Sequence, residues 1–216
     1  MLSSFSSSKK SFITINDTAD YTLTASTKRI KYLSNQAGAI LKSMVILLGV
    51  SASVSIYKAC DVVRECVHRE HTVRVVMTKQ AAEWVHPELF EALSGQPVFA
   101  PGWSYGESMP HIAVRKKADL MAVVPASANV IARSAGGFAD DPVTSTLLSF
   151  SGPKLIAPAM NPGMFLNPAT QRNLKTLKSD GFVIIEPEEG TVVCGETGPG
   201  KLASLEAILE SIESNL

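Results

Sequence analysis

A short run of small and hydroxyl residues follows the first apolar stretch of the sequence. Gly49, Ser51 and Ser53 fall within GVSAS, directly before residues with helical periodicity. The free backbone N–H groups and the dipole at a helix start favour an anion. These residues could therefore form a cradle for one phosphate group. Ser51 or Ser53 could equally do no more than cap the helix, and the residues alone leave both interpretations open.

The predicted phosphate site suits a mononucleotide better than a dinucleotide. The fingerprint G-x-G-x-x-G is absent from this segment. Thr78-Lys79 follows the second apolar run, where dinucleotide-binding enzymes place an acidic ribose ligand. We therefore expect a mononucleotide rather than NAD.

A second set of small residues follows a later apolar run, in Pro125-Ala126-Ser127-Ala128-Asn129. Small side chains there would let the backbone approach a flat ligand closely. Ser127 and Asn129 could hydrogen-bond that ligand or cap the next helix, and on its own the motif favours the cap.

Two further loops carry groups suited to substrate chemistry. In APAMNPGMF, two prolines and a glycine surround Asn161, which predicts a rigid loop whose amide could orient a carboxylate. Residues 190–201 contain four glycines, Cys194 and Lys201. This composition predicts a mobile flap carrying an accessible thiol. By contrast, Cys60 and Cys66 lie in a predicted helix without metal-ligand spacing, and we expect both to be packing residues.

The elements that must position these loops alternate along the chain from residue 44 onward. Strands are predicted at Met44–Val50, Thr72–Met77, Leu120–Val124, Lys154–Ala157 and Phe182–Ile185. Helices are predicted at Val54–His68, Asn129–Ala135, Asp141–Ser149, Pro168–Ser179 and Leu205–Ser214. Continuous apolar strands imply burial on both faces and therefore a parallel sheet. The prediction is a doubly wound, three-layer α/β/α domain whose ligands sit at the carboxyl ends of the strands.

Composition narrows the function further. The 216 residues carry no formal net charge, which gives no reason to expect a nucleic acid or membrane partner. Three cysteines without a secretory pattern favour a reducing compartment, so we expect a cytoplasmic protein and no metal site.

Residues 1–43 are rich in Ser, Thr and Lys and are predicted to be a disordered extension. A targeting peptide, or an incidental segment before a start at Met44, are the alternatives for them.

Taken together, these motifs resemble the homo-oligomeric flavin-containing cysteine decarboxylases. The resemblance runs from about Met44 to Ser204 and rests on five stretches in the family's order. They are GVSASVSIYK, MPHIAV with His111, PASANVIARSAGGFADDPVTSTL, APAMNPGMF and CGETGPGKL. Val130, Phe165 and Lys201 stand where the family often has Thr, Trp and Arg.

The resemblance implies a flavodoxin-like (Rossmann-like) fold that binds FMN, with the domain spanning 44–216. The implied cofactor-binding residues are Gly49, Ser51, Ser53, Thr78, Ser127, Ala128, Asn129, Val130 and Ala159. The implied substrate-binding residues are Met160, Asn161, Gly195 and Lys201. His111 would be the catalytic base and Cys194 the acid that protonates the decarboxylated product. His68, His71 and His86 are expected to be surface or packing residues.

Within that family, Cys194 favours the enzymes that decarboxylate 4′-phosphopantothenoylcysteine to 4′-phosphopantetheine in coenzyme A biosynthesis. Members that release peptidyl enethiols lack this cysteine, so a lantibiotic-type peptide decarboxylase is the first alternative. The second is a regulatory flavoprotein of the halotolerance type, and the third is a flavin prenyltransferase, which the loops around Cys194 and Asn161 disfavour. The expected partners are a small-molecule substrate and further copies of the chain, as a trimer or a dodecamer of trimers.

Overall fold

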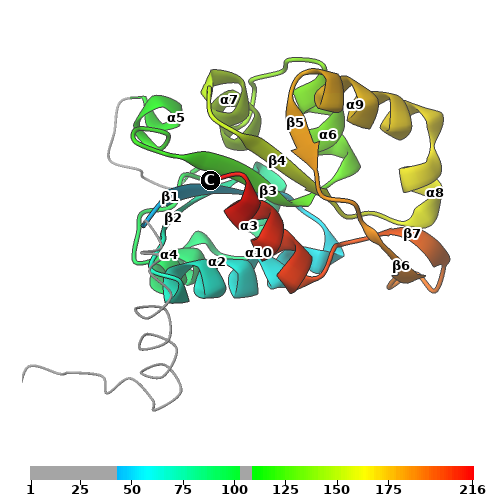
Figure 1. Cartoon of the computed structure of the whole chain (residues 1–216), viewed down its shortest axis with the longest axis horizontal. Coiled ribbons are helices and arrows are strands. Elements are labelled where there is room, and N and C mark those ends of the chain that lie inside the picture. The colour runs from blue at the N-terminus through cyan, green and yellow to red at the C-terminus, as the bar shows by residue number, and fades with distance from the viewer. Residues whose placement is uncertain (1–42, 103–108) are drawn as a thin grey trace, which may run out of the picture. The chain divides into compact units, whose positions relative to one another are not determined.

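The protein forms a parallel sheet covered by helices on both faces (Figure 1). The structure, a computed structural model, describes residues 43–102 and 109–216. The predicted extension 1–43 lies outside the described residues except for Ser43. Among the described helices, none has the length and apolar character needed to span a membrane.

The main sheet has five strands in the order β2-β1-β3-β4-β5, and every neighbouring pair is parallel. Their bounds are Val45–Val50 (β1), Thr72–Met77 (β2), Leu120–Ala126 (β3), Lys154–Pro158 (β4) and Phe182–Ile184 (β5). Each strand was predicted to within two residues, and the predicted α/β/α fold is confirmed. The strand order reverses between β1 and β3, so the loops after these two strands lie side by side at the sheet's carboxyl edge.

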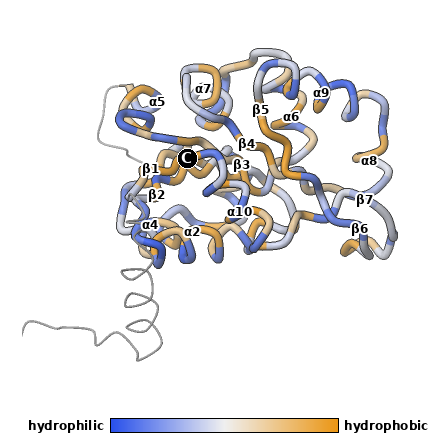
Figure 2. Tube along the Cα trace, in the orientation of Figure 1, coloured by the Kyte–Doolittle hydropathy of each residue, from blue (hydrophilic) through white to orange (hydrophobic). Residues whose placement is uncertain are grey.

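One face of the sheet is covered by α2 (Lys58–His68), α4 (Pro87–Ser94) and α10 (Leu205–Ser214). Ile46, Leu48 and Val50 of β1 point into this core, together with apolar residues of these helices. The alternate residue Leu47 joins the core on the other face. This burial on both faces explains why the strand sequences are apolar without interruption. Figure 2 shows the result as hydrophobic central strands and hydrophilic outer helix turns.

The opposite face is covered by α5 (Pro110–Ala113), α6 (Ala128–Ala135), α7 (Pro142–Ser149) and α9 (Pro168–Ser179). Pro142 is in the first turn of α7, as predicted, because Asp141 caps that helix through both its side chain and its backbone. The predicted helix over Val54–His68 is two elements, a 3-10 turn η1 (Val54–Tyr57) followed by α2.

Several short elements were not predicted. They are α3 (Lys79–Trp84), α4, α5, α8 (Pro162–Leu166), and a separate antiparallel hairpin of β6 (Glu188–Thr191) and β7 (Thr197–Lys201). The hairpin occupies the segment predicted to be a mobile flap. Its second strand is held against the start of α8, because Met160 N–H donates to Gly200 O at 2.9 Å.

Candidate active site

A cavity of about 440 Å³ opens at the carboxyl edge of the sheet. The loops after β1, β3 and β4 form one side of it, and the hairpin β6–β7 forms another. Eight of the predicted site residues line it: Ser53, Ser127, Ala128, Ala159, Met160, Asn161, Cys194 and Lys201. Three loops separated along the sequence therefore converge as the strand-end rule predicts.

A second cavity of about 200 Å³ adjoins the first, and both are lined by Ala52 and Ser127. Three more predicted cofactor-binding residues line this second space: Thr78, Asn129 and Val130. Small side chains at the junction leave room for a flat group. The second cavity is lined by two cations, Lys79 and Arg133, and by two carboxylates, Asp140 and Asp141. Arg133 is paired with Asp140, so Lys79 is the cation that fits the phosphate of a flat cofactor.

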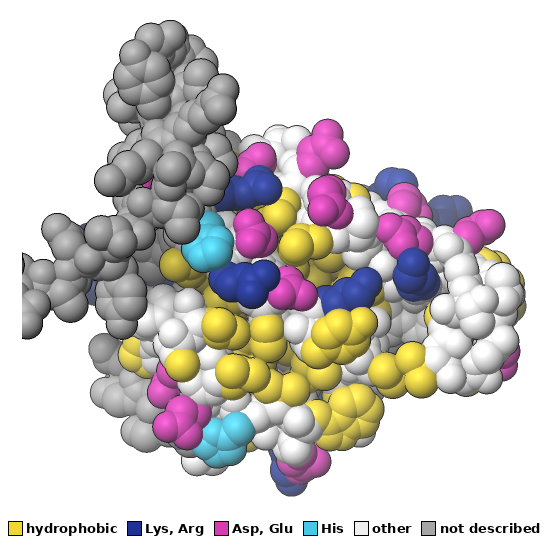
Figure 3. Space-filling model, turned by 90° about the horizontal axis from the view of Figure 1, so that it is seen from below, with side chains coloured by type: hydrophobic (Ala, Val, Ile, Leu, Met, Phe, Trp, Pro, Cys, Tyr) yellow, Lys and Arg dark blue, Asp and Glu magenta, His cyan; other side chains and the backbone are white. Residues whose placement is uncertain are grey.

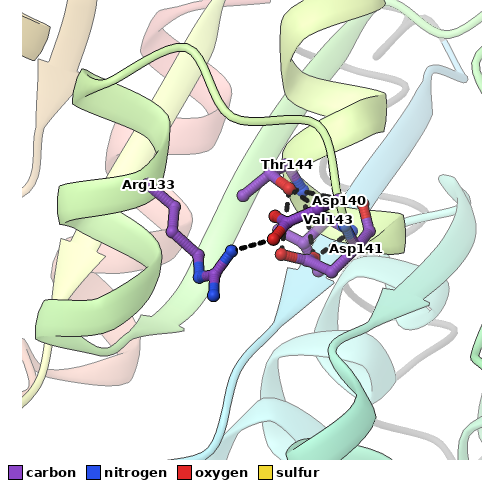
Figure 4. A network of polar contacts seen from close by, with 5 residues as sticks. All are labelled: Arg133, Asp140, Asp141, Val143 and Thr144. Atoms are coloured by element: carbon purple, nitrogen blue, oxygen red, sulfur yellow. Dashed lines mark hydrogen bonds and ion pairs between the residues drawn. The ribbon is translucent and has the colours of Figure 1, made fainter.

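Arg133 forms an ion pair with Asp140 on the wall of the second cavity (Figure 4). The hydrogen bond from Arg133 holds the pKa of the Asp140 carboxyl below its usual range. The neighbouring Asp141 accepts hydrogen bonds from Val143 N and Thr144 N, which fixes the start of α7. Polar contacts within the protein thus order this wall of the second cavity.

Ser51 has a structural position that sequence reasoning did not anticipate. It is 1% exposed, its hydroxyl donates to Pro125 O at 2.8 Å, and it accepts from Ser127 N at 2.8 Å. The hydroxyl thereby ties the loop after β1 to the loop after β3. Both of these hydrogen bonds are made inside the protein, and direct contact of Ser51 with a phosphate stays a prediction.

Ser53, Thr78 and Ser127 are all helix N-caps, which confirms the capping interpretation for Ser53 and Ser127 and adds a cap at Thr78. Their hydroxyls accept from Ser55 N, Ala81 N and Val130 N respectively. Because all three also line the cavities, capping does not exclude a role in ligand binding.

Gly49 lies inside β1 rather than in the loop after it. A Cβ added there would be 3.0 Å from Val123 Cγ2 and 3.2 Å from Val143 Cγ1. The glycine therefore permits close packing between β1, β3 and α7, and its contact with a cofactor stays a prediction.

Asn161 caps α8, and its Oδ1 accepts from Met164 N at 2.8 Å. This bond assigns the amide orientation, so the two Nδ2 hydrogens are available as donors. Asn161 lines the larger cavity and can present those donors to a substrate carboxylate. The neighbouring Met160 is fixed by its bond to Gly200 O.

Cys194 is an exposed free thiol in the turn of the hairpin. The following Gly195 has φ +85° and donates its N–H to Val192 O at 2.8 Å, which closes the turn. At the other end of the hairpin, Lys201 Nζ lies 2.8 Å from Glu188 Oε2. The hydrogen bond from Lys201 lowers the pKa of the Glu188 carboxyl. Gly195 itself does not line the larger cavity.

His111, the predicted catalytic base, lies outside both cavities. It lies on the short helix α5, which contacts α7, and it lines neither described cavity. Apolar side chains around it are exposed: Met109, Ile112 and, on α7, Leu148. A role for His111 at the cavity therefore requires something beyond one copy of the described residues.

The residues of the cavity lining that were not predicted include the large side chains Tyr57, Lys58, Trp84 and Met164. Tyr57 and Trp84 are 62% and 53% exposed, a high value for aromatic residues in a cavity wall. Figure 3 views the side of α2 and α4 and shows apolar side chains gathered there among charged ones. No sequence signal identified Tyr57 and Trp84, because Tyr57 lies within the predicted helix Val54–His68 and Trp84 ends a helix that was not predicted.

The remaining histidines and cysteines behave as expected. Cys66 is buried in the core, where desolvation raises the pKa of its thiol to about 12. His71 is also buried, whereas His68 and His86 are exposed. In the part of the chain that the structure describes, no group of three or more His, Cys, Asp or Glu side chains could hold a metal ion.

The sequence has relatives with described functions. A protein of Streptococcus mutans, described as a probable phosphopantothenoylcysteine decarboxylase, is 41% identical over 175 residues, which cover 79% of this chain and 98% of that protein. The coenzyme A biosynthesis bifunctional protein CoaBC of Mycobacterium tuberculosis is 42% identical over 163 residues, which cover 76% of this chain. The chain spans about two fifths of the length of that bifunctional protein, since the match covers 39% of it.

The fold is similar to solved structures of flavin-dependent decarboxylases. A cysteine-to-serine variant of PPC decarboxylase, complexed with pantothenoylaminoethenethiol, matches with a TM-score of 0.71 and 27% identity over 80% of this chain and 98% of that one. The FMN-dependent cysteine decarboxylase SpaF matches with a TM-score of 0.68 and 34% identity over 82% of this chain and 97% of that one. Residues 34–216 match the family described as Flavoprotein. Because this match includes every predicted site residue, the chain belongs to the Flavoprotein family.

Proposed function

We propose that the protein is an FMN-dependent decarboxylase that converts 4′-phosphopantothenoylcysteine to 4′-phosphopantetheine in coenzyme A biosynthesis. The observation that carries this proposal is the convergence of Asn161 and Cys194 on one cavity, beside the small residues Ala128 and Ala159. The relatives described as phosphopantothenoylcysteine decarboxylase and CoaBC support the choice of substrate.

The cofactor would occupy the joined cavities. Thr78, Ser127 and the backbone of Ala128–Val130 would hold it, with Ala159 beside it. Bound FMN would supply a two-electron oxidant for the thiol-bearing carbon and return the electrons at the end, so that the overall reaction is redox-neutral.

The protein's own side chains would act on the substrate in the first and the last step of this reaction. His111 would take a proton while the thiol-bearing carbon is oxidised, which places an electron sink β to the carboxylate. Asn161 Nδ2 would hold that carboxylate until the C–C bond breaks and CO₂ leaves. Cys194 would then donate a proton to the enethiolate carbon that lost CO₂. Together with the hydride that the bound flavin would return to the thiol-bearing carbon, this proton would give the saturated thiol.

His111 would reach the cavity from a second copy of the chain. Its position on α5, away from the cavity, and the exposed Met109, Ile112 and Leu148 around it support an interface between copies. A homotrimer, or an assembly of trimers, would supply such interfaces symmetrically. Light scattering should return an oligomer, and an active 23.1 kDa monomer would contradict the arrangement.

The function is tested by incubating the purified protein with 4′-phosphopantothenoylcysteine and measuring CO₂ and product mass. The flavin released by denaturation should have the mass of FMN, and an FAD mass or no flavin would exclude the proposed cofactor. The similarity to SpaF favours a cysteine decarboxylase with a different substrate as the second candidate. Peptides ending in cysteine should therefore be tested in parallel, and turnover of the peptides alone would favour that candidate.

A further inference from the structure

The larger cavity carries two positive charges that the proposed chemistry at Cys194 and Asn161 does not use. Lys58 begins α2 and Lys201 ends β7, and both side chains line the cavity. Among the described residues that line it, these two lysines are the only charged ones. This end of the cavity is therefore suited to an anion.

One of these cations, Lys201, is paired with the carboxylate of Glu188. Glu188 Oε2 contacts Lys201 Nζ at 2.8 Å, and the charge of Lys58 also acts on Glu188. The stem of Lys201 passes over Gly190, where an added Cβ would lie 3.2 Å from Lys201 Cδ. Two cations and one anion leave a net charge of about +1, with Lys201 restrained rather than free in solvent.

The position of this pair fits the end of the substrate opposite to its cysteine. Lys201 and Thr197 are the two ends of β7, and the turn with Cys194 lies beyond Thr197. At roughly 3.3 Å per residue, the lysine end and the thiol end are on the order of 10 Å apart. The cysteine carboxylate is assigned to Asn161, so the remaining anionic group of the proposed substrate is its phosphate monoester.

We propose that Lys58 and Lys201, with Glu188 positioning Lys201, bind the phosphate monoester of the substrate and select the phosphorylated compound over its dephosphorylated form. This inference rests on the proposed function for the identity of the substrate. FMN carries the same chemical group, and the residues assigned to the cofactor are divided between the two cavities. Thr78 and Asn129 line the second cavity with Lys79 and Arg133, whereas Ser53, Ala128 and Ala159 line the larger one. A titration with FMN is therefore needed to separate the two phosphates. The lysine pair shares its cavity with Asn161 and Cys194.

The test compares phosphorylated and dephosphorylated ligands on the FMN-loaded full chain. Calorimetry measures the affinity for 4′-phosphopantetheine and for pantetheine, and steady-state assays measure kcat/KM for 4′-phosphopantothenoylcysteine and pantothenoylcysteine. The variants are Lys58→Met, Lys201→Met and Glu188→Gln. Lys178→Met, which removes an exposed lysine of α9 outside both cavities, is the matched control.

The wild-type protein should bind the phosphorylated ligand more tightly, and each cavity lysine variant should lower that preference roughly tenfold, as expected for a charge-assisted hydrogen bond. Glu188→Gln should lower it less and should raise KM for the phosphorylated substrate rather than lower kcat. Lys178→Met should retain the full preference. An equal affinity of the wild type for both ligands would overturn the inference.

Titration of the apo-protein with FMN separates the two sources of phosphate. If the lysine variants lose affinity for FMN while the preference for 4′-phosphopantetheine persists, the cavity lysines serve the cofactor and the inference is wrong. If neither cysteine compound is decarboxylated but the lysine-dependent binding preference is present, the proposed reaction fails and the phosphate site stands.

Discussion

The hairpin contacts the loop that carries Asn161 at Gly200, and a substitution of this glycine tests whether activity requires that contact. It is buried in β7 with φ +118°, and its carbonyl accepts from Met160 N at 2.9 Å. A Cβ at this position would lie 2.6 Å from Met160 O and 3.1 Å from Phe165 Cβ. Gly200→Ala should therefore push the hairpin away from Met160 and Asn161.

The size of the effect follows from two contributions. A backbone conformation that is essentially restricted to glycine costs about 1–3 kcal/mol for another residue. Overpacking adds about 1–3 kcal/mol, because the nearest atom is a backbone oxygen that cannot rotate away. Together they oppose the docked hairpin by about 2–6 kcal/mol, and even the lower value reduces the docked-to-undocked equilibrium constant roughly thirtyfold at 1.4 kcal/mol per factor of ten. We expect kcat/KM to fall in proportion to the docked population that is lost.

The matched control is Gly181→Ala. Gly181 has φ +86° but nothing within 4 Å of an added Cβ, and it lines neither cavity. This variant should lose about 1 kcal/mol of stability from backbone strain and retain its rate. Urea unfolding and steady-state decarboxylation measure the two quantities separately. A folded Gly200→Ala protein with wild-type kcat/KM would refute the reasoning, as would parallel losses of rate in both variants.

Three further predictions concern the ends of the reaction and the scaffold. His111→Asn should abolish CO₂ release, whereas Cys194→Ser should still release CO₂ but yield an enethiol two mass units lighter than the saturated thiol. Mass spectrometry of a single anaerobic turnover distinguishes the two products. If Cys194→Ser made saturated product at the wild-type rate, the thiol would have no role in the reaction. Ser51→Ala should lower the free energy of unfolding by about 1–3 kcal/mol, because it removes both buried hydrogen bonds that join two loops; an unchanged urea midpoint would contradict this. Burial lowers the pKa of His71, whose Nδ1 accepts a hydrogen bond from Met44 N at 3.3 Å. As pH falls below about 6.5, the unfolded protein therefore binds a proton at this histidine before the folded protein does. The free energy of unfolding should therefore decline between pH 6.5 and the lowered pKa of the folded state. Thermal unfolding at pH 7.5 and 5.5 should show this decline in the wild type and a smaller one in His71→Gln.

The sheet and the long helices could be predicted because their signals are local. The apolar strands are buried on both faces, and α9 and α10 begin directly after the caps Asn167 and Ser204. In contrast, β7 has the sequence TGPGK, which has no strand propensity. It forms a strand because its glycines permit close approach to Met160 and Pro162, which is a tertiary contact that the sequence does not encode locally.

The candidate site was predicted in part for a comparable reason. Residues that follow strands, such as Ser127 and Asn161, are located by the topology of a parallel sheet. Tyr57, Lys58 and Trp84 lie in or beside helical segments, where sequence periodicity assigns them to the surface. Their place in the cavity depends on how η1 and α3 turn at the sheet edge. The direction of Ser51 into the protein likewise depends on the close approach of the β1 and β3 loops.

The hairpin connects the two proposed ends of the substrate. Cys194 lies in its turn, Lys201 lies at its base, and Gly198 and Gly200 between them contact Pro162 and Met160. A segment held at these points cannot slide along α8 without losing the Met160–Gly200 hydrogen bond. The distance between the thiol and the lysine pair is therefore set by the same glycines that hold the hairpin beside Asn161. Under the proposed function, this geometry would favour a substrate whose phosphate and cysteine are separated by the length of β7, and a shorter cysteine compound would reach only one end.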